Sequence, residues 1–160
     1  MDKMIKKSLI LTCVLAAPAM AGNLADAVSL QASAPDMLLR SAAANCMANA
    51  EDLSVAAKAF KDAGWQGGDA DDGGLAQFTQ DEVAADLNVD VGYCAVESSA
   101  LTFADATAVA SDLVTLDAGG KAVVEQDDEG CLDVSSDADP DNSLSITTAG
   151  QDPTCKESPG

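Results

Sequence analysis

Four cysteines, spread far apart along the chain, constrain its fold more than any other feature of the sequence. They are Cys46, Cys94, Cys131 and Cys155, and a fifth cysteine, Cys13, lies in an apolar run near the N-terminus. In an exported chain of this size, four cysteines predict two disulfide bonds, with three pairings open. Their spacing fits no zinc pattern, and the chain has no histidine and no C-x-x-C. A zinc site and a thioredoxin-type redox role therefore have no support.

The N-terminus predicts that the chain is exported. Three lysines precede a short apolar run over residues 8–17, and Ala-Met-Ala follows at 19–21. A basic start, a short apolar run and a small-residue cleavage site together indicate a secretory signal peptide. The run is shorter than the roughly 20 residues that a membrane-spanning helix needs. We therefore expect cleavage after Ala21 and a periplasmic or secreted protein that does not insert into the membrane after cleavage.

The chain that follows the signal peptide suits one domain. We expect a loose, flexible lead-in over 22–33, a single disulfide-bonded domain over 34–155 and a tail over 156–160. The apolar residues are mostly small, because the whole chain has one Trp, one Tyr and three Phe. A core of this kind is modest, so the disulfide bonds should matter for stability.

Acidic residues greatly outnumber basic ones. The chain has 27 Asp and Glu against 8 Lys and Arg. Residues 1–21 hold three lysines and one aspartate, so the mature chain has 5 basic and 26 acidic residues, a net charge of −21. Such a chain repels nucleic acid and anionic lipid, and we expect no nucleic-acid partner. It can attract cations or basic partners, although acidity also keeps an exported protein in solution.

Local signals predict three helices. Pro35 suits the first turn of a helix over 35–48. A second helix follows Asn49, which we take as its N-cap. It ends at Gly64, and Trp65 should pack back on Phe60. Thr102 with Asp105 forms a capping box for the third helix, which ends before Gly119-Gly120.

The remaining segments read as strands and turns. We expect strands at 75–80, 89–98, 121–126, 130–136 and 143–149, a turn over 66–74, and either a loop or a helical turn over 81–88. Alternation in 89–98 places Val89, Val91, Tyr93 and Ala95 on one face and Cys94 on the other. The order α-α-β-β-α-β-β-β after the signal peptide predicts a two-layer α+β domain, an antiparallel sheet with helices on one face.

Two interpretations compete for the stretch from Cys131 to Cys155. Asp137, Asp139 and Asp141 form a D-x-D-x-D pattern, as in a calcium loop. However, Asn142 replaces the usual glycine and Thr148 replaces the glutamate that completes the ligand shell. The alternative is a β-hairpin with a polar turn, because Asp, Pro and Asn favour turns.

The hairpin interpretation also favours one disulfide pairing. It brings Cys131 and Cys155 to the same end of the hairpin, so we favour a Cys131–Cys155 bond and leave Cys46 to pair with Cys94. In their predicted strands, however, Cys94 and Cys131 both alternate with the apolar residues and so lie on the opposite face from them. A Cys94–Cys131 bond is therefore also open.

The residue inventory excludes several kinds of function. Without histidine, Ser-His-Asp and Cys-His catalysis are absent, and no glycine-rich phosphate loop or basic patch is present. We expect a small non-enzymatic accessory or binding protein of the cell envelope, without a cofactor and with an unknown partner. One alternative is a divalent-cation (calcium) binding protein that uses the acidic loops 69–72 and 137–142. A third is a carboxylate-dependent hydrolase. An exposed apolar patch would favour a protein partner, and a pocket with a carboxyl of raised pKa would favour an enzyme.

Overall fold

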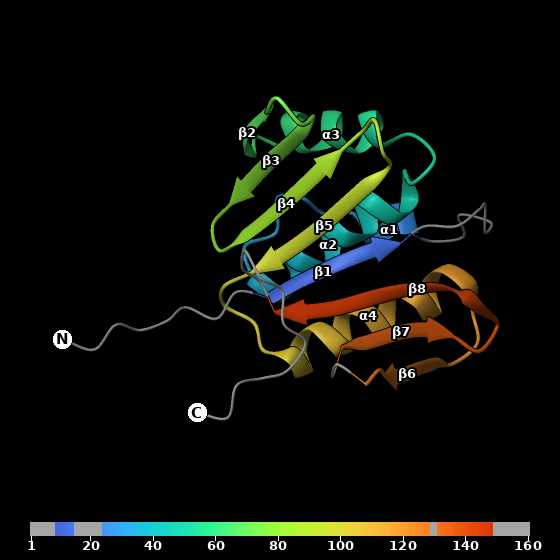
Figure 1. The fold of residues 1–160 in the computed structure, drawn as a ribbon. Helices are drawn as coiled ribbons and strands as arrows, with labels where there is room; N and C mark the ends of the chain where they lie inside the picture. Colours follow the sequence, from blue (N-terminus) through green and yellow to red (C-terminus); the bar gives the residue numbers. More distant parts are fainter. Residues whose placement is uncertain (1–8, 15–23, 129–130, 149–160) are drawn as a thin grey trace.

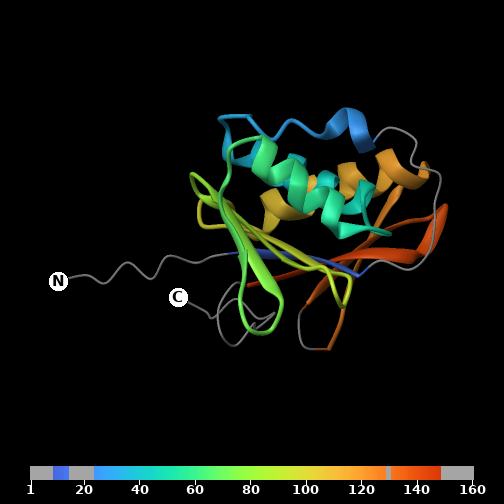
Figure 2. The same ribbon diagram turned by 90° about the horizontal axis from the view of Figure 1, so that it is seen from above.

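A computed structural model describes residues 9–14, 24–128 and 131–148 of the chain. Within these ranges the strands form one eight-stranded antiparallel sheet, and the helices pack on one face of it (Figures 1 and 2). The predicted two-layer α+β class is confirmed.

The helices are α1 (Leu24–Ala27), α2 (Pro35–Ala48), α3 (Leu53–Asp62) and α4 (Phe103–Ala118). The strands are β1 (Leu9–Val14), β2 (Gln66–Ala70), β3 (Leu75–Gln80), β4 (Val83–Asn88), β5 (Tyr93–Ser98), β6 (Ala122–Gln126), β7 (Leu132–Ser136) and β8 (Asp139–Thr148).

Strand β1 lies in the middle of the sheet. The strand order is β2-β3-β4-β5-β1-β8-β7-β6, so β1 joins two groups of strands that are each consecutive in sequence. It pairs antiparallel with β5 on one side and with β8 on the other. The sequence interpretation assigned this segment to the signal peptide and gave it no place in the fold.

The part of the expected lead-in that the structure describes packs against the domain. Leu24, Ala27 and Leu30 are buried, and α1 lies against α2. The hydroxyl of Ser41 accepts a hydrogen bond from the Ser29 backbone N–H at 3.0 Å. The segment from residue 24 is therefore not the loose lead-in that we expected. We expected a loose segment because most residues over 22–33 are small or polar.

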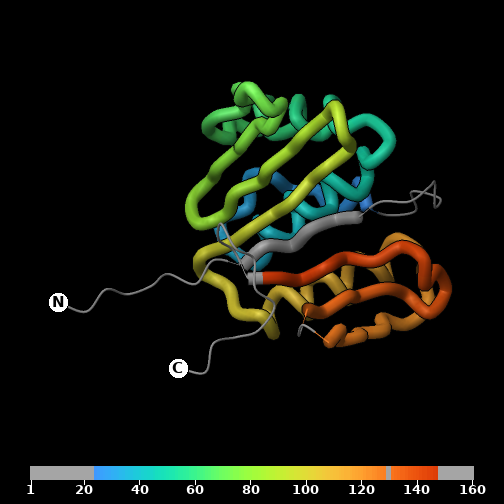
Figure 3. Tube along the Cα trace, in the orientation of Figure 1, coloured from blue at the N-terminus to red at the C-terminus, as the bar shows by residue number. Residues whose placement is uncertain are grey.

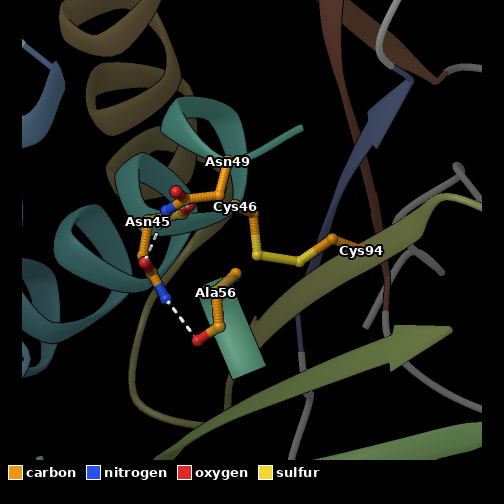
Figure 4. The surroundings of a disulfide bond; sticks show 5 residues. All are labelled: Asn45, Cys46, Asn49, Ala56 and Cys94. Carbon is orange, nitrogen blue, oxygen red and sulfur yellow. Dashed lines mark hydrogen bonds between the residues drawn. A yellow bond between two sulfur atoms is a disulfide. The ribbon is translucent and has the colours of Figure 1, made fainter. Parts of the chain in front are cut away.

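Helix α2 has the predicted bounds and supplies much of the core. Its side chains from Ser41 to Cys46 are all buried. Among them is Asn45, whose side-chain amide donates to the Ala56 carbonyl of α3 at 3.0 Å (Figure 4). Asn49 donates in turn to the carbonyl and side-chain oxygens of Asn45. This buried polar link fixes α2 against α3, because a buried amide without partners is costly.

Helix α3 ends as the sequence predicts but begins later. Asp52, not Asn49, is the N-cap, and its carboxylate accepts from the Ser54 N–H at 3.0 Å. At the C-terminus Gly64 adopts a positive φ of 86°, and the Trp65 N–H donates to the Phe60 carbonyl. The two rings lie 4.7 Å apart, and the Trp65 indole N–H donates to the Leu30 carbonyl. Trp65 is therefore a core residue, as expected.

The strands of the β2–β5 half differ most from the sequence interpretation. The segment 66–74 is not only a turn, since β2 occupies its first part. The ambiguous segment 81–88 is strand β4, with Val83, Ala85 and Leu87 buried at alternate positions. Val89 and Val91 of the predicted apolar face lie in an exposed turn before β5, whereas Ala95 of that face is buried, as expected. Cys94 and Val96, on the opposite face of the strand, are fully buried under the helices.

The two faces of the sheet have different characters. Helices α2 and α4 cover one face, where Cys94 and Val96 of β5 and Leu144 and Ile146 of β8 are buried. As predicted, Leu144 and Ile146 point the same way. Within the described residues no helix covers the other face (Figure 2), and side chains such as Glu97 and Ser145 are partly exposed there. The core thus lies in a single layer between sheet and helices.

A disulfide bond links the helix layer to the sheet. Cys46 at the end of α2 bonds to Cys94 of β5, with the Cα atoms 6.2 Å apart (Figure 4). This pair confirms the pairing that we left for Cys46 and overturns the alternative of Cys94 with Cys131. Cys131 is also disulfide-bonded. Its predicted partner, Cys155, lies outside the described residues, so that pairing stays a prediction.

Candidate functional site

Two turns lie side by side at one end of the sheet. One connects β2 to β3 and the other connects β4 to β5, and both are at the upper end of the β2–β5 half in Figure 3. The Asn88 side-chain amide joins them, because it donates to the Gly73 carbonyl at 2.9 Å. The oxygen of the same amide accepts from the N–H groups of Asp90 and Val91. Asn88 therefore holds the second turn in shape and fixes it to the first.

The first turn is shaped by an aspartate. Asp71 accepts hydrogen bonds from the N–H groups of Gly73 and Leu75, both at 2.9 Å. Gly74 follows with a positive φ of 79°, a conformation that glycine adopts without strain. A side chain at Gly74 would also approach the Asp90 carboxylate at 3.2 Å. The close contact of the two turns thus depends on this glycine.

Apolar side chains are exposed on the second turn. The exposed fractions are 44% for Val89, 73% for Val91 and 36% for Tyr93. Asp71, Asp72 and Asp90 lie in the two turns around them. We call these six residues the hairpin-tip surface: Asp71, Asp72, Val89, Asp90, Val91 and Tyr93. Exposed large apolar side chains that are close together in the chain can mark a surface that binds another protein.

A carboxylate pair lies at the opposite end of the same half-sheet, on the uncovered face. Glu97 of β5 pairs with Ala84 of β4, and Asp86 lies two residues further along β4 on the same face of the sheet. Partial burial, and then the nearby Asp86 charge, raise the pKa of Glu97 above its usual value. Gln77 of β3 donates to Asp86 at 2.8 Å. Because Gln77 is neutral, it leaves the negative charge of the pair uncompensated.

A shallow depression adjoins Glu97. It has a volume of about 190 Å³ and is lined by residues of the β3–β4 turn together with Glu97 and Ser99. Typical ligand pockets are roughly 300 Å³ or larger and mostly apolar, whereas this depression is open and includes Asp81 and Glu82. Glu97 and the depression thus meet one requirement of a carboxylate-dependent hydrolase, because the pKa of this carboxyl is raised. They do not meet a second requirement, because the depression is not an enclosed cavity.

The three aspartates of the predicted calcium loop do not gather around one point. Asp137 accepts from the Lys121 backbone N–H at 2.7 Å and ties the β7–β8 turn to the loop after α4. Asp139 and Asp141 belong to β8, because the strand begins two residues after the turn starts. Among the described residues, no group of three or more acidic or cysteine side chains is placed to hold a metal ion. Of the two interpretations, the described part of this stretch, 131–148, has the form of the β-hairpin.

Asp139 instead faces Asp117 at the C-terminal end of α4. Burial, and then the charge of Asp139, raise the pKa of Asp117. The adjacent cavity, lined by Asp117, Ser136 and Asn142 among others, measures about 10 Å³. That is roughly the space for a single water molecule, so it is too small to bind a substrate.

No protein-family model, curated protein or solved structure matches this chain. The geometry of the described residues is therefore the basis for a proposed function. Sequence reasoning missed the hairpin-tip surface, since it assigned Val89, Val91 and Tyr93 to the apolar face of a strand and considered Asp71 and Asp72 only as part of an acidic loop. The signal available was the Gly92 between Val91 and Tyr93, which favours a turn.

Proposed function

We propose that this protein is an exported, disulfide-bonded binding protein of the cell envelope, without catalytic activity, that holds a basic protein partner. The observation that carries the proposal is the hairpin-tip surface, where Val89, Val91 and Tyr93 are exposed between acidic turns. The signal peptide predicted over 1–21 supports export. The Cys46–Cys94 bond supports an oxidising compartment, because disulfide bonds persist there.

The chemistry of the partner follows from the surface. An apolar side chain of the partner can cover Val91, which is the most exposed large apolar side chain among the described residues. Lysine or arginine around that contact would face Asp71, Asp72 and Asp90. Charge complementarity of this kind speeds association and excludes acidic partners. Among the described residues no helix is long and apolar enough to cross a membrane.

Site-specific photo-crosslinking in the cell envelope of the producing organism tests this proposal. A photoreactive residue at position 91 should give a discrete crosslinked product whose partner has a net positive charge. Val55, which is 49% exposed on α3, is the matched control position. The proposal predicts that Val91→Asp abolishes binding of the purified partner and that Val55→Asp does not. Identical products from positions 91 and 55 would contradict it.

A divalent cation is the second candidate ligand, proposed on the acidity of the turns at 69–72 and 137–142 alone. Thermal melts of the oxidised protein in calcium, magnesium or EDTA at matched ionic strength test it, because a ligand of the folded state raises the melting temperature. We expect equal melting temperatures, since the Asp137 carboxylate accepts a hydrogen bond from the Lys121 backbone N–H and no three acidic or cysteine side chains of the described residues are placed to hold a metal ion together. A calcium-specific rise that Asp137→Asn removes would replace our proposal with the cation alternative.

A further inference from the structure

Strand β1 is the only direct link between the two halves of the sheet within the described residues. Its register pairs Leu11 with Val96 of β5 on one side and with Ile146 of β8 on the other. Both of these partners are fully buried, and β1 also lies against α2 and α4. Its backbone therefore completes the hydrogen bonding of two strands at the centre of the fold (Figure 1).

The same segment lies inside the predicted signal peptide. Cleavage after Ala21 adds water across the Ala21–Gly22 peptide bond and leaves a new carboxyl end and a new amino end. The product that remains, 22–160, lacks β1. Its strands then form two separate groups, β2 to β5 and β6 to β8, held together by the packing of α2 on α4 and the chain that connects β5 to α4.

Removal of β1 uncovers two strand edges that face each other. The edge of β5 and the edge of β8 would each present unpaired backbone N–H and C=O groups beneath the helix layer. Buried backbone groups without partners are costly, and an open edge is a template for another strand. Because β5 and β8 are both antiparallel to β1, they run parallel to each other, and one inserted strand satisfies both.

We propose that the place of β1 is a strand-binding site, which in the mature protein takes an extended segment of a partner polypeptide. The proposal rests on the export of the chain and adds a second, deeper contact to the surface contact at the hairpin tip. The inserted strand runs antiparallel to both β5 and β8, as β1 does. Binding by addition of a strand to a sheet draws its affinity from main-chain hydrogen bonds.

The register defines which sequence the site accepts. Positions equivalent to Leu11 and Cys13 align with buried residues of both β5 and β8, and the position equivalent to Leu9 aligns with the buried Ser98 of β5. These three positions therefore require apolar side chains. The position equivalent to Ile10 aligns with Glu97 and Thr147 on the uncovered face. A basic residue fits there, because opposite charges on neighbouring strands stabilise a sheet. Proline cannot occupy the inserted strand, because β5 and β8 both need its backbone N–H groups as hydrogen-bond donors.

A cut-and-exchange experiment on the full chain tests the site. A specific protease sequence replaces residues 16–20, between β1 and α1, and the oxidised protein is purified intact and then cut. Fluorescein-labelled peptide 8–15, carrying Cys13→Ala, is added in excess, and its incorporation is followed by anisotropy and size exclusion. We expect the labelled peptide to replace the 1–15 fragment and to be displaced by the same peptide without label.

Three variant peptides report on specificity. Thr12→Pro should abolish incorporation, because it removes a donor and the extended fit. Ile10→Lys should bind several-fold more tightly than Ile10→Glu, and the difference should vanish in a Glu97→Gln protein. Amide hydrogen exchange in β5 and β8 should rise when the fragment is removed and fall again when the peptide binds.

Other results would overturn the site. Unchanged amide protection in β5 and β8 after removal of the fragment would show that these strands pair with each other or never needed β1. Unfolding that excess peptide does not reverse would show that β1 is an integral strand and not a ligand. Equal incorporation of the proline peptide would show non-specific adhesion.

Failure of export is distinguished by a separate measurement. N-terminal sequencing of the protein from the producing cells should begin at Gly22. A chain that keeps Met1 while the peptides still exchange would refute signal-peptide cleavage and leave the strand site standing as a property of the fold. A chain that begins at Gly22 but takes up no peptide would refute the strand site alone.

Discussion

Glu97 shows how the uncovered face of the sheet limits stability at the level of a single residue. Its pKa is raised by partial burial and by the Asp86 charge. Folding therefore favours the protonated form, and the stability that this form confers is lost as the pH rises above the usual carboxyl range. At neutral pH the charged Glu97 opposes folding.

A neutral substitute at this position should therefore stabilise the protein. We expect Glu97→Gln to raise the melting temperature at neutral pH and to have little effect below the usual glutamate pKa of 4.5. Melting curves at several pH values measure this difference. Glu82→Gln, an exposed position in the neighbouring turn, controls for general relief of the excess negative charge. A pH-independent effect of Glu97→Gln, or an equal effect of Glu82→Gln, would contradict the assignment.

The hydrogen-bond partners of buried polar residues could not be predicted from the sequence. Asn45 lies in a run of small residues, and nothing local shows that its amide crosses to the Ala56 carbonyl of the next helix. The hairpin-tip residues were misplaced because Val89, Val91 and Tyr93 alternate as a half-buried strand does. The pairing of β4 with β5 ends at Asn88 and Tyr93, and only this pairing shows that Val89 and Val91 lie in the turn between the strands.

At the scale of elements, the helices were the predictable part. The capping box of α4 forms as predicted: Thr102 accepts from the Asp105 N–H at 3.2 Å, and Asp105 accepts from the Thr102 N–H at 2.9 Å. Such signals are local, because caps and glycine stops act within one turn of the chain. Strand β4 was missed because its small side chains, such as Ala84 and Ala85, obscured the alternation of Val83, Ala85 and Leu87.

The capping box gives a prediction for α4. Thr102→Ala should lower the free energy of unfolding by about 1 kcal/mol, because it leaves helix N–H groups without an acceptor. Thr115→Ala is the control, since Thr115 lies in the same helix and only bonds back to the Ser111 carbonyl. Urea unfolding followed by circular dichroism measures both variants. An equal loss in the two would show that the cap contributes nothing specific.

At the scale of the whole molecule, the Cys46–Cys94 bond joins the helix layer to the half-sheet that carries the hairpin-tip surface. The two cysteines are 48 residues apart in sequence, so the bond restricts a long loop of the unfolded chain. This restriction matters in a protein whose core is rich in alanine and holds few aromatic side chains. The sequence predicted the bond only by elimination, because cysteine pairing depends on the tertiary arrangement.

Removal of this bond should destabilise the whole domain. We expect the double variant Cys46→Ala, Cys94→Ala to lose roughly 2 to 4 kcal/mol of unfolding free energy. Urea titration should also show a steeper dependence on denaturant, because the unfolded chain expands. A Cys46→Val, Cys94→Val double variant keeps more of the buried volume and separates the lost cross-link from a cavity. A loss below about 1 kcal/mol in both would mean that the loop is already restricted in the unfolded state.

The pairing of β1 with β8 has a mechanical consequence. Leu9, the first residue of β1, lies opposite Thr148, the last residue of β8, and the ladder runs inward from there to Val14 and Ser143. A force that pulls the two ends of the chain apart therefore acts perpendicular to the two strands. It separates the residue pairs one after another, beginning with Leu9 and Thr148. A shearing force along the strands would have to break all the pairs at once. In the chain that retains β1, the β1–β8 ladder at the centre of the sheet is thus the part that opens most easily under tension between the termini.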